Sequence, residues 1–538
     1  MSTIICRRLT FGYPGSEGNV FEDFDVLIDT RWRCALVGRN GRGKTTLLRL
    51  LHGELVPDTG GIERAGPTAY FPPRVMDSGR RVRDVVKDAA GPFRRWESAM
   101  ADALVDGGEA ALARYGEILH KYEAAGGYTV DAAIEAELSA LDVDERSWDR
   151  TFSSLSGGEQ TRCLLASLFV SDGSSPTGSP GRNGARPFVL IDEPTNHLDA
   201  PGRQRVAEYL RSKPGFLLVS HDRAFLDACC DHVVALNRDT VEVERASFSD
   251  WRERFRGRLE SQRARNVALK QDIARLGQVA GDRRAGALKR ESEKAAHTDK
   301  GFISRRAKRQ MKRALVAERR AERAADERRR TLVDVEKERH LKLPNSPRVA
   351  GSLVVANDLS AWRGEKRVFA KQSFTISPGD RVAVVGPNGS GKTSLLDMIG
   401  GASFRHTGTL SRPGYVRVAR TFQHPQWTSG LLRDRLRDAG LDESRFRQIM
   451  ATLGVRGRVL DGRIEDFSHG QQKKVDLART FLIEADLLLW DEPLNFIDID
   501  AREQIEDVLL RDQPTVVFVE HDTAFVDNVA TQVVRLPS

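Results

Sequence analysis

The sequence predicts an α/β protein made of two similar domains in tandem, joined by a long antiparallel helical hairpin. The first observation is a long-range repeat: residues 33–51, RCALVGRNGRGKTTLLRLL, recur as residues 381–399, RVAVVGPNGSGKTSLLDMI. The second is that each copy runs from an apolar strand through a glycine-rich turn into a helix with apolar spacing. The third is a pair of segments between the copies that are rich in helix-forming residues and nearly free of proline and glycine.

The composition of the chain is that of a globular protein with a surplus of charge. Hydrophobic residues make up 40% and charged residues 30% of the 538 residues, which excludes wholesale disorder and fibrous repeats. The five cysteines are too few and too irregularly placed for a disulfide framework or a zinc motif. The longest apolar runs fall well short of the roughly 20 residues of a membrane helix, and a secretory signal is not recognisable. We therefore expect a cytoplasmic protein that does not span a membrane.

The positions of the repeat predict three parts: a first domain at 1–250, a linker at 251–345 and a second domain at 346–538. The first domain has about 36 extra residues between its glycine-rich loop and a later serine-glycine stretch. These residues lie at about 88–140, where apolar residues recur at helical spacing, so we expect an added helical arm. Residues 171–187 are rich in glycine, proline and serine, which predicts a surface loop.

The linker carries all of the excess positive charge of the chain. Residues 251–345 contain 29 Lys and Arg against 14 Asp and Glu, a net charge of +15, whereas the rest of the chain carries −7. The helical pattern breaks at about 295–304, where we expect the tip of the hairpin. Helices of about 35 to 40 residues would reach roughly 50 to 60 Å. A basic spike of this length between two domains favours contact with nucleic-acid phosphates over a merely solvated coiled coil.

Both copies of the repeat contain the complete phosphate-loop (P-loop) pattern GxxxxGK[ST], at 38–45 and 386–393. In this pattern the glycines let backbone N–H groups close around phosphates, the lysine holds the β- and γ-phosphates, and the Ser/Thr hydroxyl binds Mg²⁺. Two full matches in the same strand-to-helix context predict two ATP sites. The loop residues expected to bind ATP are Gly38, Asn40, Gly41, Gly43, Lys44, Thr45 and Thr46 in the first domain and Gly386, Asn388, Gly389, Gly391, Lys392, Thr393 and Ser394 in the second.

Each domain also has an apolar strand that ends in Asp-Glu-Pro, within VLIDEP and LLWDEP. At the end of a buried strand that follows a P-loop, the aspartates Asp192 and Asp491 are placed to hold the magnesium shell together with Thr45 and Thr393. The adjacent glutamates, Glu193 and Glu492, are placed to orient or deprotonate the attacking water. The two domains therefore have the same predicted catalytic groups in the same order.

LSGGEQ at 155–160 resembles the signature motif of ATP-binding cassette (ABC) proteins, and the likeness covers about 440 residues outside the linker. The resemblance implies two P-loop ABC-type ATPase domains in tandem, paired head to tail within one monomer, with ATP and Mg²⁺ as cofactors. It also implies that each signature caps the γ-phosphate bound on the P-loop of the other domain. The implied signature residues are Ser156, Gly157 and Gly158 at the second site and Ser468 and Gly470 at the first. The implied switch histidines, which contact the γ-phosphate and have catalytic roles, are His221 and His521.

Other family positions are partly altered in this sequence. Tyr13 and Trp362 fall where the family places an adenine-stacking aromatic residue, although each could instead belong to the core. Gln423 matches the Q-loop glutamine, which contacts ATP and the magnesium ion, whereas the first domain has Pro73 there. The second signature reads FSHGQ in place of LSGGE. We therefore expect two unequal sites, with the site built from the first P-loop and the second signature as the slower one.

A fused pair of ABC domains around a long linker resembles the ABC-F family of translation factors, whose linker enters the ribosomal exit (E) site and reaches toward the peptidyl-transferase centre. The segments 299–313, 467–475 and 490–498 look like its antibiotic-resistance branch, the Vga, Lsa and VmlR type. The resemblance implies binding to the 70S ribosome through 23S rRNA and P-site tRNA, with displacement of a bound antibiotic and with neither DNA nor a membrane as partner. The residues expected to contact RNA are Arg283, Arg284, Lys289, Arg290, Lys300, Phe302, Arg305, Arg306, Lys308, Arg309 and Lys312.

Two alternatives remain open from the sequence. The chain could be the ATPase subunit of an antibiotic exporter with a separate membrane partner, which would have no use for a long basic spike. It could also be a housekeeping ABC-F translation factor that confers no resistance. Co-purification with a membrane protein would favour the first alternative, and unchanged drug susceptibility of an expressing host would favour the second.

Overall fold

The computed structural model describes residues 3–15, 18–170, 187–196, 198–237, 240–292, 312, 316, 323–324, 341–344 and 351–537. The chain divides into two compact units, one formed by Met1–Ser249 with Arg339–Ser538 and the other by Asp250–Glu338. The first unit contains both copies of the repeat, and the second contains most of the basic linker. The predicted hairpin tip at 295–304 and, apart from Pro187, the predicted loop at 171–187 lie outside the described residues.

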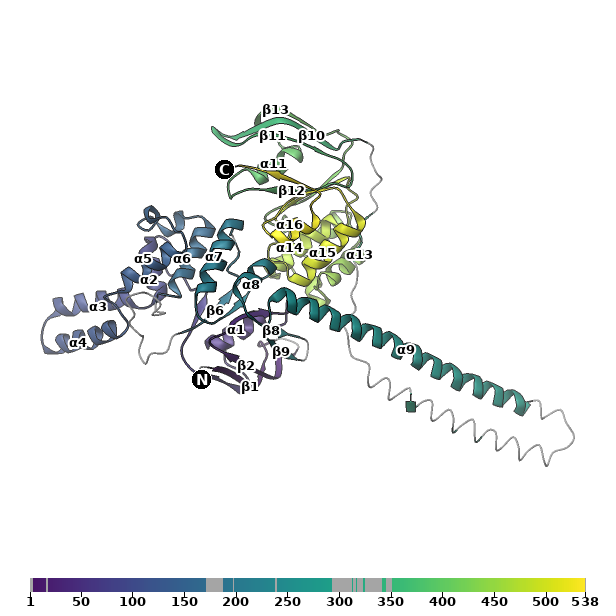
Figure 1. Ribbon diagram of the computed structural model, residues 1–538, viewed down its shortest axis with the longest axis horizontal. Coiled ribbons are helices and arrows are strands. Elements are labelled where there is room, and N and C mark those ends of the chain that lie inside the picture. Colours follow the sequence, from purple (N-terminus) through teal and green to yellow (C-terminus); the bar gives the residue numbers. More distant parts are fainter. Residues whose placement is uncertain are drawn as a thin grey trace. The chain divides into compact units, whose positions relative to one another are not determined.

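A six-stranded sheet with the order β5-β6-β7-β3-β8-β9 forms the centre of the first copy of the repeat (Figure 1). All neighbouring strands are parallel except β9, which is antiparallel to β8. The central strands are buried on both faces, as expected for parallel strands covered by helices. Its strands are β3 (Arg33–Val37), β5 (Thr68–Phe71), β6 (Phe188–Asp192), β7 (Phe216–Val219), β8 (His232–Leu236) and β9 (Val241–Glu244).

A three-stranded antiparallel sheet, β2-β1-β4, shares a hydrophobic core with this central sheet. Its strands are β1 (Thr3–Phe11), β2 (Phe21–Asp29) and β4 (Thr59–Arg64). The helices and 3-10 turns of the first copy are α1 (Lys44–His52), α2 (Val82–Ala90), α3 (Phe93–Asp106), α4 (Glu109–Ala124), α5 (Val130–Ala140), η1 (Glu145–Ser147), η2 (Phe152–Ser154), α6 (Gly157–Ser167), α7 (Ala200–Ser212) and α8 (Arg223–Cys229). Helices α3 and α4 pack against each other within 88–140, where the sequence predicts a helical arm (Figure 1).

The second copy repeats this arrangement with a five-stranded parallel sheet, β14-β15-β16-β12-β17, and an antiparallel sheet, β11-β10-β13. Its strands are β10 (Val354–Arg363), β11 (Lys366–Ile376), β12 (Arg381–Val385), β13 (Arg405–Ser411), β14 (Val418–Thr421), β15 (Leu487–Asp491), β16 (Val516–Val519) and β17 (Gln532–Arg535). Its helices and turns are α11 (Lys392–Ile399), α12 (Leu432–Asp438), α13 (Glu443–Thr452), η4 (Gly457–Asp461), η5 (Ile464–Asp466), α14 (His469–Thr480), α15 (Ile499–Asp512) and α16 (Thr523–Val529). Corresponding functional segments therefore follow corresponding strands in both copies.

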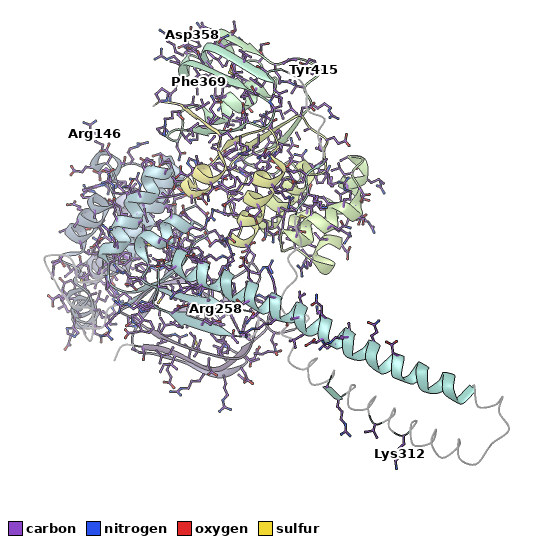
Figure 2. All side chains as sticks on the ribbon, turned by 45° about the vertical axis from the view of Figure 1, so that its right-hand side comes forward. Arg146, Arg258, Lys312, Asp358, Phe369 and Tyr415 are labelled. Atoms are coloured by element: carbon purple, nitrogen blue, oxygen red, sulfur yellow. The ribbon has the colours of Figure 1, made fainter. Side chains whose placement is uncertain are left out.

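The basic linker begins with one long helix, α9 (Phe248–Ser292), of 45 residues. At 1.5 Å per residue a helix of this length extends over roughly 65 to 70 Å. Most of the described side chains between Arg252 and Arg275 are exposed or half-buried, and the exposed Arg258 is labelled in Figure 2 together with the exposed Lys312. A search of the described residues finds no helix with the length and the apolar character that crossing a membrane requires.

Candidate active sites

Both P-loops run from the end of a central strand into the N-terminus of a helix and depend on glycine there. Gly43 has φ 83° in the left-handed region, and a Cβ added to it would lie 2.5 Å from Val20 Cγ1. Gly391 has φ 89°, and its Cβ would lie 2.6 Å from Val368 Cγ1. Neither α1 nor α11 has a side-chain N-cap. The first N–H groups of both helices are therefore available to an anion, as a phosphate site requires.

The P-loop lysines are buried and fold back over their own loops. Lys44 Nζ donates to the carbonyl oxygen of Gly38 at 2.7 Å, and Lys392 Nζ donates to those of Gly386 and Pro387 at 2.9 Å each. Burial lowers the pKa of each ammonium, and nearby carboxylates oppose this shift. Each ammonium is thereby held at the centre of the loop, where triphosphate oxygens can replace the carbonyl partners.

The predicted magnesium ligands come together in both copies. Thr45 Oγ1 donates to Asp192 Oδ2 at 2.8 Å, and Tyr70 donates its hydroxyl to the same oxygen at 3.2 Å. In the second copy, burial raises the pKa of Asp491, and Thr393 opposes this shift. Both carboxylate oxygens of Asp491 are buried without a hydrogen-bond partner among the described residues, which fits a site for a cation. Among the described residues there is no group of three or more His, Cys, Asp or Glu that could hold a metal. A few oxygen donors at each site suit Mg²⁺, which usually keeps several waters and binds substrate phosphates.

The two glutamates after these aspartates adopt backbone conformations that the sequence does not reveal. Glu193 has φ 51° and Glu492 has φ 48°, a left-handed region that non-glycine residues rarely occupy. This turn aims each carboxylate toward the histidine of the neighbouring strand end. His221 Nε2 lies 3.3 Å from Glu193 Oε1, and His521 Nε2 lies 3.5 Å from Glu492 Oε1. The structure thus brings together the predicted catalytic pair in each copy.

The two carboxylates differ in their electrostatic environment. Burial, with a contribution from the charge of Asp192, raises the pKa of Glu193 to about 8. Burial acts in the same direction on Glu492, but hydrogen bonds from His521 and Gln423 outweigh it and hold its pKa at about 2. Asn495 adds a further donor, with its Nδ2 at 2.6 Å from Glu492 Oε2. In the absence of nucleotide and metal, the environment of the second glutamate therefore favours its ionised form, whereas that of the first favours its protonated form.

The altered second signature keeps the local geometry of the first. Ser156 caps α6 through a capping box with Glu159, and Ser468 caps α14 through a capping box with Gln471. The change from Glu to Gln thus preserves both hydrogen bonds and removes a carboxylate from the helix N-terminus. A Cβ added to Gly470 would lie 2.6 Å from the carbonyl oxygen of Phe496, so this glycine is required by the packing.

The first P-loop and the second signature line the same cavity, of about 500 Å³. The cavity is lined on the first copy by Asn40, Gly41, Glu193 and His221, and on the second by residues that include Ser468, Gly470, Gln471, Lys474 and Phe496. The charge of Asp498 acts on Lys44, and the charge of Asp199 acts on Lys392. This reciprocity is the head-to-tail relation that the sequence predicts. No described contact links Ser156, Gly157 or Gly158 to the second P-loop.

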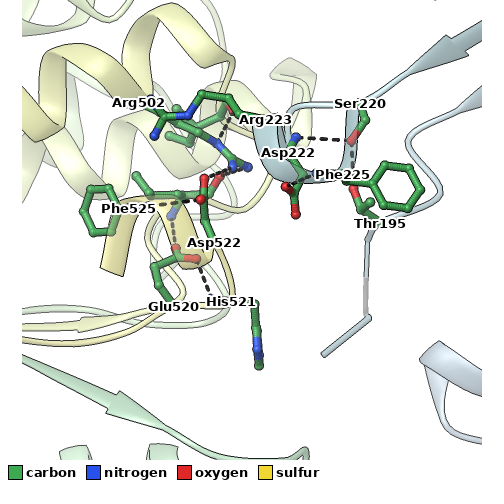
Figure 3. A network of polar contacts seen from close by, with 12 residues as sticks. Thr195, Ser220, Asp222, Arg223, Phe225, Arg502, Glu520, His521, Asp522 and Phe525 are labelled. Atoms are coloured by element: carbon green, nitrogen blue, oxygen red, sulfur yellow. Dashed lines mark hydrogen bonds and ion pairs between the residues drawn. The ribbon is translucent and has the colours of Figure 1, made fainter. Parts of the chain in front are cut away.

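Polar contacts connect the loop after each glutamate to the end of the strand that precedes the switch histidine, and the two copies build these contacts differently (Figure 3). In the first copy, the hydroxyls of Thr195 and Ser220 share a hydrogen bond of 3.1 Å. In the second, Glu520 accepts from the backbone N–H groups of Leu494 at 2.8 Å and His521 at 3.0 Å. Sequence reasoning missed Glu520 and Asn495. The signal for Glu520 was the difference between VSHD and VEHD in otherwise matching motifs, whereas Asn495 matches Asn196 of the first copy and gave no such signal.

Of the two aromatic residues predicted to stack on adenine, Tyr13 contacts its P-loop segment. Tyr13 is 40% exposed and its hydroxyl lies 3.0 Å from Thr46 Oγ1, a neighbour of the P-loop lysine. Trp362 is half-buried, with the guanidinium of Arg405 at 5.7 Å from its ring centroid. The role of either ring as an adenine platform stays a prediction.

The residues predicted to contact RNA are only partly described. Arg283, Arg284, Lys289 and Arg290 belong to α9, and Lys312 is exposed. The remaining predicted residues lie outside the described part of the chain, namely Lys300, Phe302, Arg305, Arg306, Lys308 and Arg309.

Both copies of the repeat match a known protein family. The family model described as "ABC transporter" matches residues 21–175 and 369–495. The chain is 26% identical to the putative ATP-binding protein YdiF of Bacillus subtilis, over 96% of this chain and 78% of that protein. It is 26% identical to the energy-dependent translational throttle protein EttA of Mycobacterium tuberculosis, over 96% and 88% of the two chains. It is 29% identical to the tylosin resistance ATP-binding protein TlrC of Streptomyces fradiae, over 94% and 92%.

A solved structure agrees with the same fold. The complex of the archaeal ribosomal stalk protein aP1 with the ribosome recycling factor aABCE1 matches with a TM-score of 0.60 at 19% identity, covering 98% of this chain and 87% of that one. The predicted α/β fold of two tandem ATPase domains is thereby confirmed.

Proposed function

Because the chain belongs to the ABC transporter family and is therefore a Mg²⁺-dependent ATP hydrolase, we propose that it is a cytoplasmic ABC-F factor that binds the 70S ribosome. The observation that carries this proposal is the basic linker, with a net charge of +15, between two complete ATPase copies. Its described part includes the helix α9, of 45 residues. A long basic helix suits the phosphates of rRNA and tRNA, where charge neutralisation and counterion release dominate affinity.

The roles of the site residues follow from their positions. Lys44 and Lys392, with the N-termini of α1 and α11, bind and orient the triphosphate. The oxygens of Thr45 with Asp192, and of Thr393 with Asp491, would hold Mg²⁺, which would supply charge stabilisation at the phosphates. The glutamates orient the attacking water and accept its proton, and the histidines hold the glutamates in place. Ser468 and Gly470 close the first site, and we propose the same role for Ser156, Gly157 and Gly158 at the second.

The names of the relatives support the ribosomal assignment. EttA is named as a translational throttle, and TlrC is named as a tylosin resistance protein. Both align with more than nine tenths of this chain, linker included. We propose that ATP binding closes the two ATPase domains, that the closed form fits the ribosomal E site, and that the linker repositions P-site tRNA near the peptidyl-transferase centre.

The finer proposal is that this movement displaces a ribosome-targeting antibiotic, as in the resistance branch of ABC-F. The altered second signature and the sequence WDEPLNFID at 490–498 are the features that favour this branch. Drug susceptibility of an expressing host tests it: the minimal inhibitory concentration of an antibiotic that acts at the peptidyl-transferase centre should rise. Unchanged susceptibility to every such class would reduce the proposal to a housekeeping ABC-F factor.

Ribosome binding is tested by sedimentation of the Glu193→Gln, Glu492→Gln variant with 70S ribosomes in ATP. Reversing Arg283, Arg284, Lys289 and Arg290 to Glu should abolish co-sedimentation, because repulsion replaces phosphate contacts. The matched control reverses four exposed basic residues outside the linker, Arg95, Arg146, Lys366 and Arg367. Equal binding by both variants would contradict the proposal. Recovery with a membrane protein instead of ribosomes would favour the exporter subunit.

A further inference from the structure

Two consecutive lysines on α14 follow the second signature and are deeply buried. Lys473 is 2% exposed and Lys474 is 1% exposed. A buried ammonium group is unfavourable unless it is paired or hydrogen-bonded. The partners of each lysine therefore indicate which parts of the protein it holds together.

Lys474 belongs to the first ATP site. Its Nζ lies 2.5 Å from Oδ2 of Asp498, the N-cap residue of α15, and its side chain lines the cavity that contains Asn40 and Glu193. Lys474 thus holds α14 beside the cavity that Ser468 and Gly470 also line.

Lys473 reaches the second ATP site. Its Nζ donates to the carbonyl oxygens of Phe422 at 2.6 Å, Gln423 at 3.1 Å and Asp491 at 3.4 Å. Gln423 is the Q-loop residue that bonds Glu492, and Asp491 is the predicted magnesium ligand. One ammonium group therefore holds the backbone of both segments that position the second catalytic glutamate.

Two other residues on α14 hold the same Q-loop segment. Asp476 Oδ2 accepts from the backbone N–H of Phe422 at 3.3 Å, and Arg479 Nη2 donates to the carbonyl oxygen of Arg420 at 2.8 Å. Lys473, Asp476 and Arg479 follow one another at intervals of three residues. They therefore lie on one face of α14. A shift of α14 would therefore be transmitted to residues 420–423.

The first copy has no such link among its described contacts. Thr161 occupies the position of Lys473, and its hydroxyl donates to the carbonyl oxygen of Gly157 in its own helix at 2.9 Å. Arg162, in the position of Lys474, donates to the carbonyl oxygens of Leu141 and Asp142. The first copy also lacks a Q-loop glutamine, because Pro73 stands there.

We propose that Lys473 is a positioning residue that couples the two ATP sites in one direction, from occupancy of the first site to turnover at the second. Helix α14 begins at the signature that closes the first site, and Lys473 connects the same helix to the Q-loop and magnesium aspartate of the second. The inference rests on the ATPase activity and the pairing of the first P-loop with the second signature, and it does not depend on ribosome binding.

The test measures ATP turnover of the purified full chain without ribosomes. Lys473→Met keeps the length and apolar volume of the side chain and removes the donor, and Lys473→Thr copies the first half. In a Glu193→Gln background, which reports on the second site, either variant should lower kcat about tenfold because misplaced catalytic groups are costly. The KM for ATP should change by less than about twofold, since the P-loop is untouched. In a Glu492→Gln background, turnover at the first site should change by less than about twofold.

Coupling is measured by a double-mutant cycle with Lys44→Ala, which removes ATP from the first site. Lys44→Ala should lower turnover at the second site about fivefold when Lys473 is present and less than about twofold when it is replaced. Thr161→Val is the matched control. In this variant Lys44→Ala should still lower turnover at the second site about fivefold, as in the parent chain. Additive effects, equal losses at both sites, or unchanged turnover in the Lys473 variants would overturn the proposal. So would loss of folding in both Lys473 variants, since Lys473 would then be a structural residue.

Discussion

The two ATPase copies share their P-loops and differ around their catalytic glutamates. The glycines, lysines and threonines of both P-loops occupy equivalent positions, and both glutamates have the same left-handed backbone. Around Glu492, however, Gln423, Asn495 and His521 donate hydrogen bonds, whereas the corresponding Q-loop position near Glu193 is Pro73. The two copies therefore share the nucleotide-binding geometry, while a few differing residues give the two glutamates different pKa values.

This difference agrees with the expected order of the two sites. A general base must be ionised to accept a proton from water. Glu492, with a pKa of about 2, meets this condition at neutral pH, and Glu193, with a pKa of about 8, does so only in part. We therefore expect most ATP turnover at the second site and slower turnover at the first.

The largest expected effect is loss of a P-loop lysine. Lys392→Ala should lower total ATP turnover about a hundredfold, because it removes the charge that stabilises the phosphates at the faster site. Lys44→Ala should lower it only several-fold. Steady-state phosphate release measures both variants, and equal losses would remove the distinction between the sites.

The next largest loss of turnover is expected from a change in the Q-loop. Gln423→Ala removes a donor to Glu492, so its pKa should rise and turnover at the second site should fall about tenfold. The matched change in the first copy is Pro73→Gln, which should leave the second site within about twofold of the parent chain. The measurement is ATP turnover at the second site in the Glu193→Gln background. An unchanged rate in Gln423→Ala would show that Gln423 does not position Glu492.

The pH dependence of the two sites should differ. In the Glu492→Gln variant, turnover at the first site should rise by up to about tenfold per pH unit below pH 8 and level off above it, because Glu193 becomes ionised there. In the Glu193→Gln variant, turnover at the second site should be flat between about pH 6 and 9 as far as Glu492 is concerned. Identical pH profiles of turnover in the two variants would contradict the different pKa values of Glu193 and Glu492.

The raised pKa of Glu193 also affects stability. A carboxyl group whose folded-state pKa lies above its unfolded value favours the folded state in its protonated form. Its relative contribution is therefore largest below the unfolded pKa and declines as the pH rises toward about 8. Thermal unfolding between pH 5 and about 9 should show a smaller decline in Glu193→Gln than in the parent chain, where other buried carboxyl groups such as Glu520 also contribute.

The smallest expected effect concerns the networks behind the switch histidines. Glu520→Ser leaves the backbone N–H groups of Leu494, which is buried, and His521, which is half-buried, without their acceptor and should cost about 1 to 3 kcal/mol of stability. Adding Leu494→Thr recreates the hydroxyl pair of the first copy and should recover part of this loss. Ser220→Ala is the matched change in the first copy and should cost about 1 kcal/mol. The melting temperature of each variant measures these losses. Equal melting temperatures of Glu520→Ser and of the double variant would show that a hydroxyl pair cannot replace the Glu520 contacts.

The sequence predicted the fold and the P-loop chemistry because these depend on local patterns. Strand, glycine turn and helix lie within about 20 contiguous residues, so the repeat alone identifies them. The environments of Glu193 and Glu492 depend instead on side chains more than 20 residues away, such as His521, and on a left-handed backbone that no residue type signals. The buried bonds of Lys473 to residues about 50 positions earlier are likewise invisible without the structure.

The most direct test of two unequal sites is the comparison of Glu193→Gln with Glu492→Gln in steady-state ATP turnover at saturating ATP. Both variants keep their P-loops and signatures, so the difference reports on the catalytic carboxylate alone. We predict that Glu492→Gln retains less than about a tenth of the parent rate and that Glu193→Gln retains about half or more. Identical residual rates in the two variants would contradict the account.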